Sequence, residues 1–172
     1  MRIPRTLLVS SLCLVLLAAL AWSQNRKAGL WEITSTMTWQ QSPFPAGMMG
    51  QMGGHTPFGG GPHTTQICVT QEQIDKYGTV PPQTHGDCQM TNIVKKTNSM
   101  TADIVCTGHN SGKGTIAASW TDDEHSTSKM HFLGTMDMGQ ESRPIEWTVD
   151  SSSVYKGADC GNVKPFQAPT AQ

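Results

Sequence analysis

Apolar and polar residues alternate along residues 29–40, near the start of the chain. Alternation with a period of two is typical of a strand that buries one face. One face of this strand is expected to carry large apolar residues, and the other glutamate, threonine and glutamine. The residues of the apolar face are Trp31, Ile33, Ser35, Met37 and Trp39.

The same alternation recurs further along the chain and predicts more strands. We expect strands over residues 64–69, 88–96, 100–107, 113–121, 125–133 and 143–155, joined by turns at 97–99, 108–112 and 122–124 and by a looser stretch at 134–141. Strands joined by short turns pair as antiparallel hairpins. The pattern predicts an all-β fold, an antiparallel meander of six or seven strands that forms a curved open barrel or a sandwich.

One short helix is expected at residues 71–76. Thr70 is placed to cap its start, and Gln73 occupies the third helical position, as in a capping box. Val69 and Ile74 have the spacing of a hydrophobic staple. A glycine and two prolines that follow predict that the helix ends before them.

The first 21 residues, 1–21, have the composition of a secretory signal peptide. Two arginines precede an apolar run over residues 7–20, which ends in Ala19-Leu20-Ala21, a pattern that signal peptidase cleaves. The alternative is an uncleaved membrane anchor, but a spanning helix needs about 20 apolar residues. We therefore expect cleavage, no transmembrane segment afterwards, and a periplasmic or secreted protein.

Loss of the signal peptide changes the charge balance. The mature chain, residues 22–172, has 10 basic and 13 acidic residues, and it contains no run of basic residues longer than the pair Lys95-Lys96. A basic patch for nucleic acid is absent from this pattern, so nucleic acid is not expected as a partner. The length fits a single β-rich domain.

Four cysteines of the mature chain are expected to form two disulfides, because exported proteins fold in oxidising compartments. A hairpin over residues 88–106 that turns near Thr97 places Cys88 and Cys106 opposite each other, at a distance a disulfide can bridge. Cys68 and Cys160 are then left to pair.

Residues 41–63 are rich in glycine, proline and methionine and carry no charged side chain except histidine. This composition predicts a flexible insertion. Thioether and imidazole groups are also ligands that suit copper, so the segment is a candidate copper site. The alternative is a flexible loop whose methionines bind no metal. The candidate ligands are Met48, Met49, Met52, His55 and His63.

Four tryptophans fall on the apolar faces of predicted strands. They form either a packed core or the lining of a concave site for an apolar ligand. The four are Trp31, Trp39, Trp120 and Trp147. The sequence holds no framed nucleophile and no phosphate-binding loop, so we expect neither an enzyme nor a bound cofactor.

Several short motifs occur in a fixed order along the chain. They are Gly29-Leu30-Trp31-Glu32, Cys68-Val69-Thr70-Gln71-Glu72-Gln73, the hairpin bracketed by Cys88 and Cys106, and the ending Gly157-x-x-Cys160-Gly161. In this order they resemble the exported bacterial family known as domain of unknown function 3617. The resemblance implies a β-rich, periplasmic or secreted protein, and it implies no activity.

The sequence thus predicts an exported, non-enzymatic binding or interaction module. Its expected partner is an apolar small molecule or another component of the cell envelope. Copper binding by the loop 48–63 is the alternative function.

Overall fold

The structure is a computed structural model that describes residues 26–45, 61–81, 87–139 and 141–165. The expected signal peptide lies outside these residues, as does the part of the expected insertion at 46–60. The described residues form seven β-strands and one short helix. The elements in chain order are β1 (Gly29–Gln41), β2 (Pro62–Val69), α3 (Gln71–Tyr77), β3 (Cys88–Lys95), β4 (Ser99–Thr107), β5 (Asn110–Ser119), β6 (His125–Asp137) and β7 (Ser142–Gly157).

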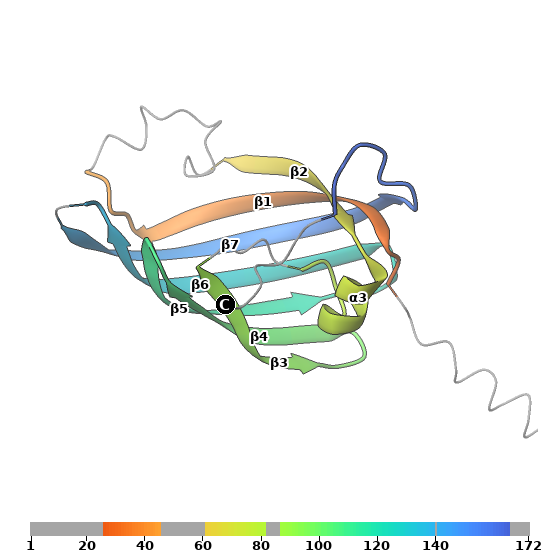
Figure 1. Ribbon diagram of the computed structural model, residues 1–172, viewed down its shortest axis with the longest axis horizontal. Helices are drawn as coiled ribbons and strands as arrows, with labels where there is room; N and C mark the ends of the chain where they lie inside the picture. The colour runs from red at the N-terminus through yellow and green to blue at the C-terminus, as the bar shows by residue number, and fades with distance from the viewer. Residues whose placement is uncertain (1–25, 46–60, 82–86, 140, 166–172) are drawn as a thin grey trace, which may run out of the picture.

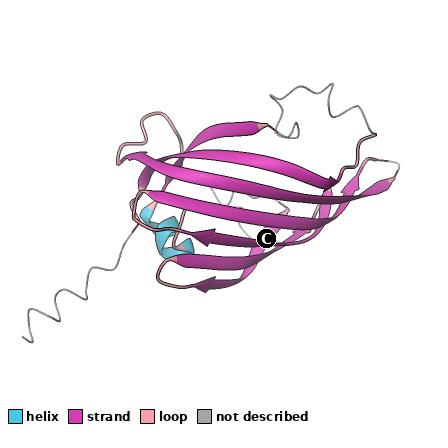
Figure 2. Ribbon diagram, turned by 180° about the vertical axis from the view of Figure 1, so that it is seen from behind, coloured by secondary structure: helices cyan, strands magenta, loops and turns pink. Residues whose placement is uncertain are grey.

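All seven strands belong to one antiparallel sheet with the order β2-β1-β7-β6-β5-β4-β3. The sheet is strongly curved and does not close, because β2 and β3 form its two edges (Figures 1 and 2). The prediction of an all-β fold with six or seven strands is confirmed, and of the two architectures expected, the curved open one is found and the sandwich is not.

Strands β3 to β7 form the predicted meander, but one pairing joins distant parts of the sequence. β1 pairs with β7 along most of its length, from Leu30 opposite Gly157 to Gln41 opposite Glu146. The first and last of the described strands therefore lie side by side, next to the edge strand β2 (Figure 1).

Two predicted irregular stretches are wrong. Residues 110–112 belong to β5 and not to a turn, and residues 134–137 extend β6 instead of forming a looser stretch. Gly112 and Gly134, which suggested turns, lie opposite each other in the β5–β6 ladder. A Cβ on Gly134 would come within 2.2 Å of the Ser111 carbonyl oxygen and 3.0 Å of the Phe132 ring. These glycines permit close approach inside a strand pair.

The expected insertion at 41–63 is also shorter than predicted. Gln41 is the last residue of β1, and residues 62–63 already belong to β2. Both ends of the segment are held by the β1–β2 pair, in which Thr36 lies opposite Pro62.

The helix begins where predicted and ends one residue later than predicted, at Tyr77, before Gly78. Thr70 accepts a hydrogen bond from the Gln73 backbone N–H, and the Gln73 side chain accepts one from the Thr70 N–H, which completes the capping box. Gly78 ends the helix in the left-handed conformation, with φ of 74°. Figures 1 and 2 show α3 within the curve of the sheet, near one end of the strands.

The concave side, called the inner face here, is the face that carries the predicted apolar positions. It holds two clusters of buried residues. The smaller cluster joins β1 and β2 to α3 and contains Trp31, Ile33, Ile67, Val69 and Ile74. The larger cluster contains Met100, Ala102, Ile104, Cys106, Ile116, Ala118, Trp120, Phe132, Met136 and Ile145.

Both predicted disulfides are confirmed. Cys88 and Cys106 are bonded across the β3–β4 hairpin, at directly opposite positions. Cys68 and Cys160 join the end of β2 to the segment after β7, across 92 positions of sequence. The described residues include no helix with the length and hydrophobicity of a membrane span.

Candidate functional site

The strand register sorts the four tryptophans of the inner face into two pairs. Trp31 and Trp120 lie at the α3 end and are buried, at 0% and 5% exposure. Trp39 and Trp147 lie directly opposite each other on β1 and β7, further along the strands, and are only partly buried. The inner face therefore has two different halves.

The closed half is defined here by Trp31, Trp120 and Arg26, whose guanidinium lies over both indole rings. Its central carbon is 4.6 Å from the centroid of Trp31 and 5.5 Å from that of Trp120. Arg26 is 2% exposed. Because Trp31 belongs to the smaller cluster and Trp120 to the larger one, this arginine connects the two hydrophobic clusters.

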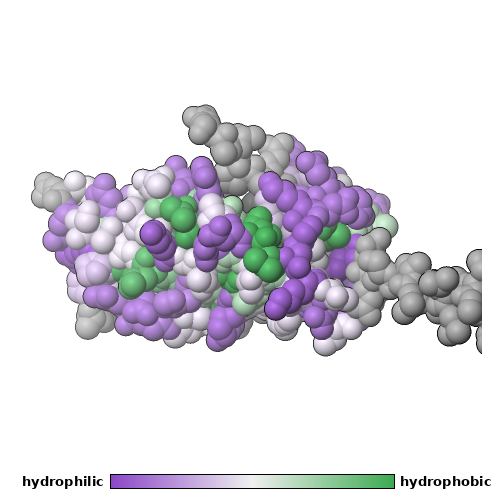
Figure 3. All heavy atoms as spheres, turned by 90° about the horizontal axis from the view of Figure 1, so that it is seen from below, coloured by the Kyte–Doolittle hydropathy of each residue, from purple (hydrophilic) through white to green (hydrophobic). Residues whose placement is uncertain are grey.

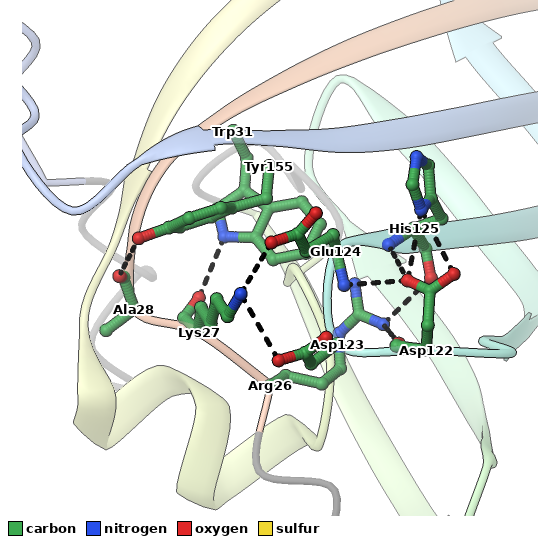
Figure 4. A network of polar contacts seen from close by, with 9 residues as sticks. All are labelled: Arg26, Lys27, Ala28, Trp31, Asp122, Asp123, Glu124, His125 and Tyr155. Carbon is green, nitrogen blue, oxygen red and sulfur yellow. Dashed lines mark hydrogen bonds and ion pairs between the residues drawn. The ribbon is translucent and has the colours of Figure 1, made fainter.

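The turn between β5 and β6 holds Arg26 from the other side (Figure 4). Arg26 Nη1 donates hydrogen bonds to the carbonyl oxygens of Asp122 and His125, at 3.1 and 3.0 Å. Its Nε and Nη2 have no hydrogen-bond partner among the described residues. Burial lowers the pKa of Arg26 to about 10, although the charges of Asp122 and Asp123 oppose this shift.

Acidic residues of the same turn hold the neighbouring lysine. Lys27 Nζ lies 2.5 Å from Glu124 Oε1 and 3.3 Å from Asp123 Oδ2. The hydrogen bond to Glu124 is the main cause that raises the pKa of Lys27. Trp31 Nε1 donates to the Lys27 carbonyl oxygen at 2.9 Å. The residues just before β1 are thereby fixed to the β5–β6 turn, 96 and 97 positions later in the chain.

Asp122 organises the turn itself. Its Oδ1 accepts the backbone N–H of Glu124 at 2.8 Å and that of His125 at 2.7 Å. The His125 Nδ1 lies 3.0 Å from the same oxygen. The hydrogen bond from Glu124 is the largest cause that lowers the pKa of Asp122, with His125 adding to it. This cluster holds the backbone carbonyls that receive Arg26, which is a structural role.

Serine side chains separate the two halves. The inner face between the tryptophan pairs carries Ser35, Ser126, Ser128, Ser151 and Ser153. The hydroxyls of Ser35 and Ser151, on neighbouring strands, share a hydrogen bond of 2.8 Å. A polar belt thus crosses β1, β7 and β6 in the middle of the concave face, and the same row continues on β5 and β4 with the buried apolar residues Ala118 and Met100.

The open half lies beyond this belt. Its apolar side chains pack against the larger cluster but are themselves only partly buried. Trp147 stacks on the buried ring of Phe132, with the centroids 5.1 Å apart. The partly buried residues, which define the open half here, are Trp39, Met90, Ile93, Met130 and Trp147. Such a concave surface of aromatic and methionine side chains is suited to an apolar group.

The predicted copper ligands are only partly placed. Met48, Met49, Met52 and His55 lie outside the described residues. His63 is described and lies exposed on β2, opposite Ser35. The described part of the chain contains no group of three or more histidine, cysteine, aspartate or glutamate residues that could hold a metal ion.

Histidines of the outer face form pairs with carboxylates and no larger cluster. His131 Nε2 lies 2.9 Å from Glu146 Oε1 on the neighbouring strand, and the two side chains are 48% and 34% exposed. His131 occupies the face opposite Phe132, as expected from the alternation. Sequence reasoning did not find Arg26, because a single arginine before a strand carries no pattern that indicates burial.

Comparison with known families identifies the chain. The sequence model of the family described as "Protein of unknown function (DUF3617)" matches residues 26–160. The chain belongs to this family. The matched DUF3617 segment begins at Arg26 and ends at Cys160, so it includes the closed half, the open half and all four disulfide cysteines. No curated protein and no solved structure gives a match.

Proposed function

We propose that this DUF3617 protein is an exported, non-enzymatic binding module whose open half receives an apolar group of a small molecule or envelope component. The observation that carries the proposal is the row of partly buried aromatic and methionine side chains on a concave face, next to fully buried ones. A bound apolar group would complete the burial of these side chains. Such burial is favourable by roughly 25 cal/mol per Å² of apolar surface removed from water.

Two features support export as part of this proposal. The disulfides Cys68–Cys160 and Cys88–Cys106 are of the kind that persists in oxidising compartments. The N-terminal sequence has the charge, apolar run and small-x-small site of a signal peptide.

The serine belt sets what kind of ligand fits. An apolar group in the open half ends against the hydroxyls of Ser35 and Ser151. A ligand with an apolar body and a polar, hydrogen-bonding end would match both parts of the inner face. We infer an amphipathic molecule as the preferred ligand class.

Fluorescence titration with N-phenyl-1-naphthylamine, a neutral apolar probe, tests the proposal. We expect a fluorescence increase with wild type, and a loss of affinity of about ten-fold with Met37→Lys, which places a charge on the inner face beside Trp39. The control is Leu133→Lys, on the outer face of β6 and 55% exposed, which should bind as wild type. Equal binding by both variants, or no increase with wild type, would overturn the proposal.

The copper alternative has its own measurement. Titration of the purified protein with Cu(I) is expected to show tight binding only if the methionines and histidines of residues 45–63 act as ligands. Binding no tighter than about micromolar, or binding that survives deletion of residues 45–63, would exclude this function.

A further inference from the structure

The outer face of the sheet carries an unbroken row of hydroxyl side chains across six neighbouring strands. The register places each member directly opposite the next: Thr64 on β2 faces Thr34 on β1, and the row continues through β7, β6, β5 and β4. Its members, which define the hydroxyl row, are Thr64, Thr34, Ser152, Thr127, Ser119 and Ser99.

Neighbouring strands lie about 4.8 Å apart, so six strands give the row a length of about 24 Å. Two of its contacts are direct hydrogen bonds, between Thr34 and Thr64 at 2.9 Å and between Ser119 and Thr127 at 3.1 Å. Each hydroxyl can donate one hydrogen bond and accept others. The row is therefore a fixed, linear array of donors and acceptors.

A groove of about 640 Å³ runs beside the row, across β1, β7, β6, β5 and β4. Its other wall is formed by residues of the same face that lie two positions away from the row on each strand. They are Thr36, Asp150, Lys129, Ala117 and Thr101. Ala117, which lies opposite Lys129, has a small side chain, so the groove is shallow on this side. A long and shallow groove accommodates an extended chain better than a compact ligand.

Charge and hydrophobicity narrow the class of occupant. Lys129 is the one cation among the residues that line the groove, and Asp150 neutralises it at 2.9 Å, which disfavours an anionic polymer. None of the described lining residues is tryptophan, tyrosine or arginine, the residue types from which protein interfaces draw most of their affinity. On the face in view, Figure 3 shows hydrophobic residues only as separate patches among polar ones.

We propose that the hydroxyl row and its groove bind a neutral linear polysaccharide. Such a chain presents hydroxyls along its whole length, each able to pair with a serine or threonine of the row. Individual hydrogen bonds of this kind contribute little, so binding depends on many of them in register along a polymer. This site lies on the face opposite the open half and is independent of the function proposed there.

The register supplies a closely matched pair of variants. Ser119 and Thr127 are opposite each other on β5 and β6 within the row, and Ser111 and Thr135 are opposite each other on the same two strands and the same face, but far from the groove. All four side chains are exposed. Ser119→Ala with Thr127→Val removes two hydroxyls from the site, and Ser111→Ala with Thr135→Val removes the same two groups elsewhere.

Affinity electrophoresis in gels that contain hydroxyethylcellulose, a soluble neutral glucan, gives the measurement. We expect wild type and the Ser111/Thr135 variant to be retarded equally, and the Ser119/Thr127 variant to bind about ten-fold more weakly. Raising the salt concentration should leave the retardation unchanged, because no unpaired charge takes part. Thermal melting of both variants checks that each is folded.

Three results would overturn the proposal. Equal weakening by the two double variants would mean that the row has no special role. Retardation by the anionic polysaccharide alginate alone, lost at high salt, would assign binding to Lys129 and an anionic ligand. An absence of retardation of wild type by the glucan would exclude the ligand class and favour a protein as the occupant of this face.

Discussion

The two halves of the inner face use the same residue type for different purposes. In the closed half, Trp31 and Trp120 are buried and an arginine lies between them, held by the β5–β6 turn. In the open half, Trp39 and Trp147 have the same strand alternation and stay partly exposed. The difference teaches that an apolar strand face does not by itself distinguish core from binding surface. The covering groups do, here α3 and the Arg26 side chain.

The largest contrast is expected between alanine substitutions in the two halves. Trp31→Ala removes a fully buried ring that stacks edge-on with Tyr155, and should lower the free energy of unfolding by about 3–5 kcal/mol. Trp39→Ala removes a partly exposed ring and should cost about 1–2 kcal/mol. Urea unfolding of the two variants measures the difference. Equal losses would mean that both halves are core and would remove the basis of the open half as a site.

Arg26 gives the next largest effect. Arg26→Ala removes both cation–π contacts and leaves the carbonyls of Asp122 and His125 without their donor, so we expect a loss of about 2–3 kcal/mol. Arg26→Lys should recover little, because an ammonium group cannot lie flat between two rings.

The same urea experiment measures the Arg26 variants, and binding of N-phenyl-1-naphthylamine provides the control. The probe should bind the Arg26 variants as it binds wild type, because the arginine lies outside the open half. Loss of probe binding together with stability would show that the two halves are one unit, and the comparison between them would fail.

Local patterns in the sequence predicted much of this fold. Alternation gave the strands and their faces, the capping box gave the helix, and a hairpin gave Cys88–Cys106, all from residues close in sequence. The β1–β7 pairing and the Arg26 contacts were not predictable in this way, since Arg26 meets Asp122 across 96 positions. Which tryptophans are covered depends on these distant contacts. Local sequence patterns therefore could not decide whether a tryptophan belongs to a packed core or to the lining of a binding site.

Asp122 gives the smallest expected effect and separates charge from geometry in the closed half. Its pKa is lowered below the ordinary value of 3.8 by the hydrogen bonds it accepts, so its carboxylate stabilises the fold above that pH, and the contribution is lost as pH falls through the lower, folded pKa. Asp122→Asn keeps an oxygen that can accept the same two N–H groups but removes the charge. We therefore expect a small loss of stability at pH 7 that shrinks toward zero once the medium is acidic enough to protonate the wild-type aspartate.

Asp137→Asn is the matched control, because Asp137 accepts one backbone N–H, from Gly139, in the turn before β7 and does not contact the Arg26 network. Urea midpoints at neutral and acidic pH measure the effect. A loss that stays the same at both would mean that Asp122 acts through geometry alone, and that the charge of the turn contributes nothing to holding the closed half shut.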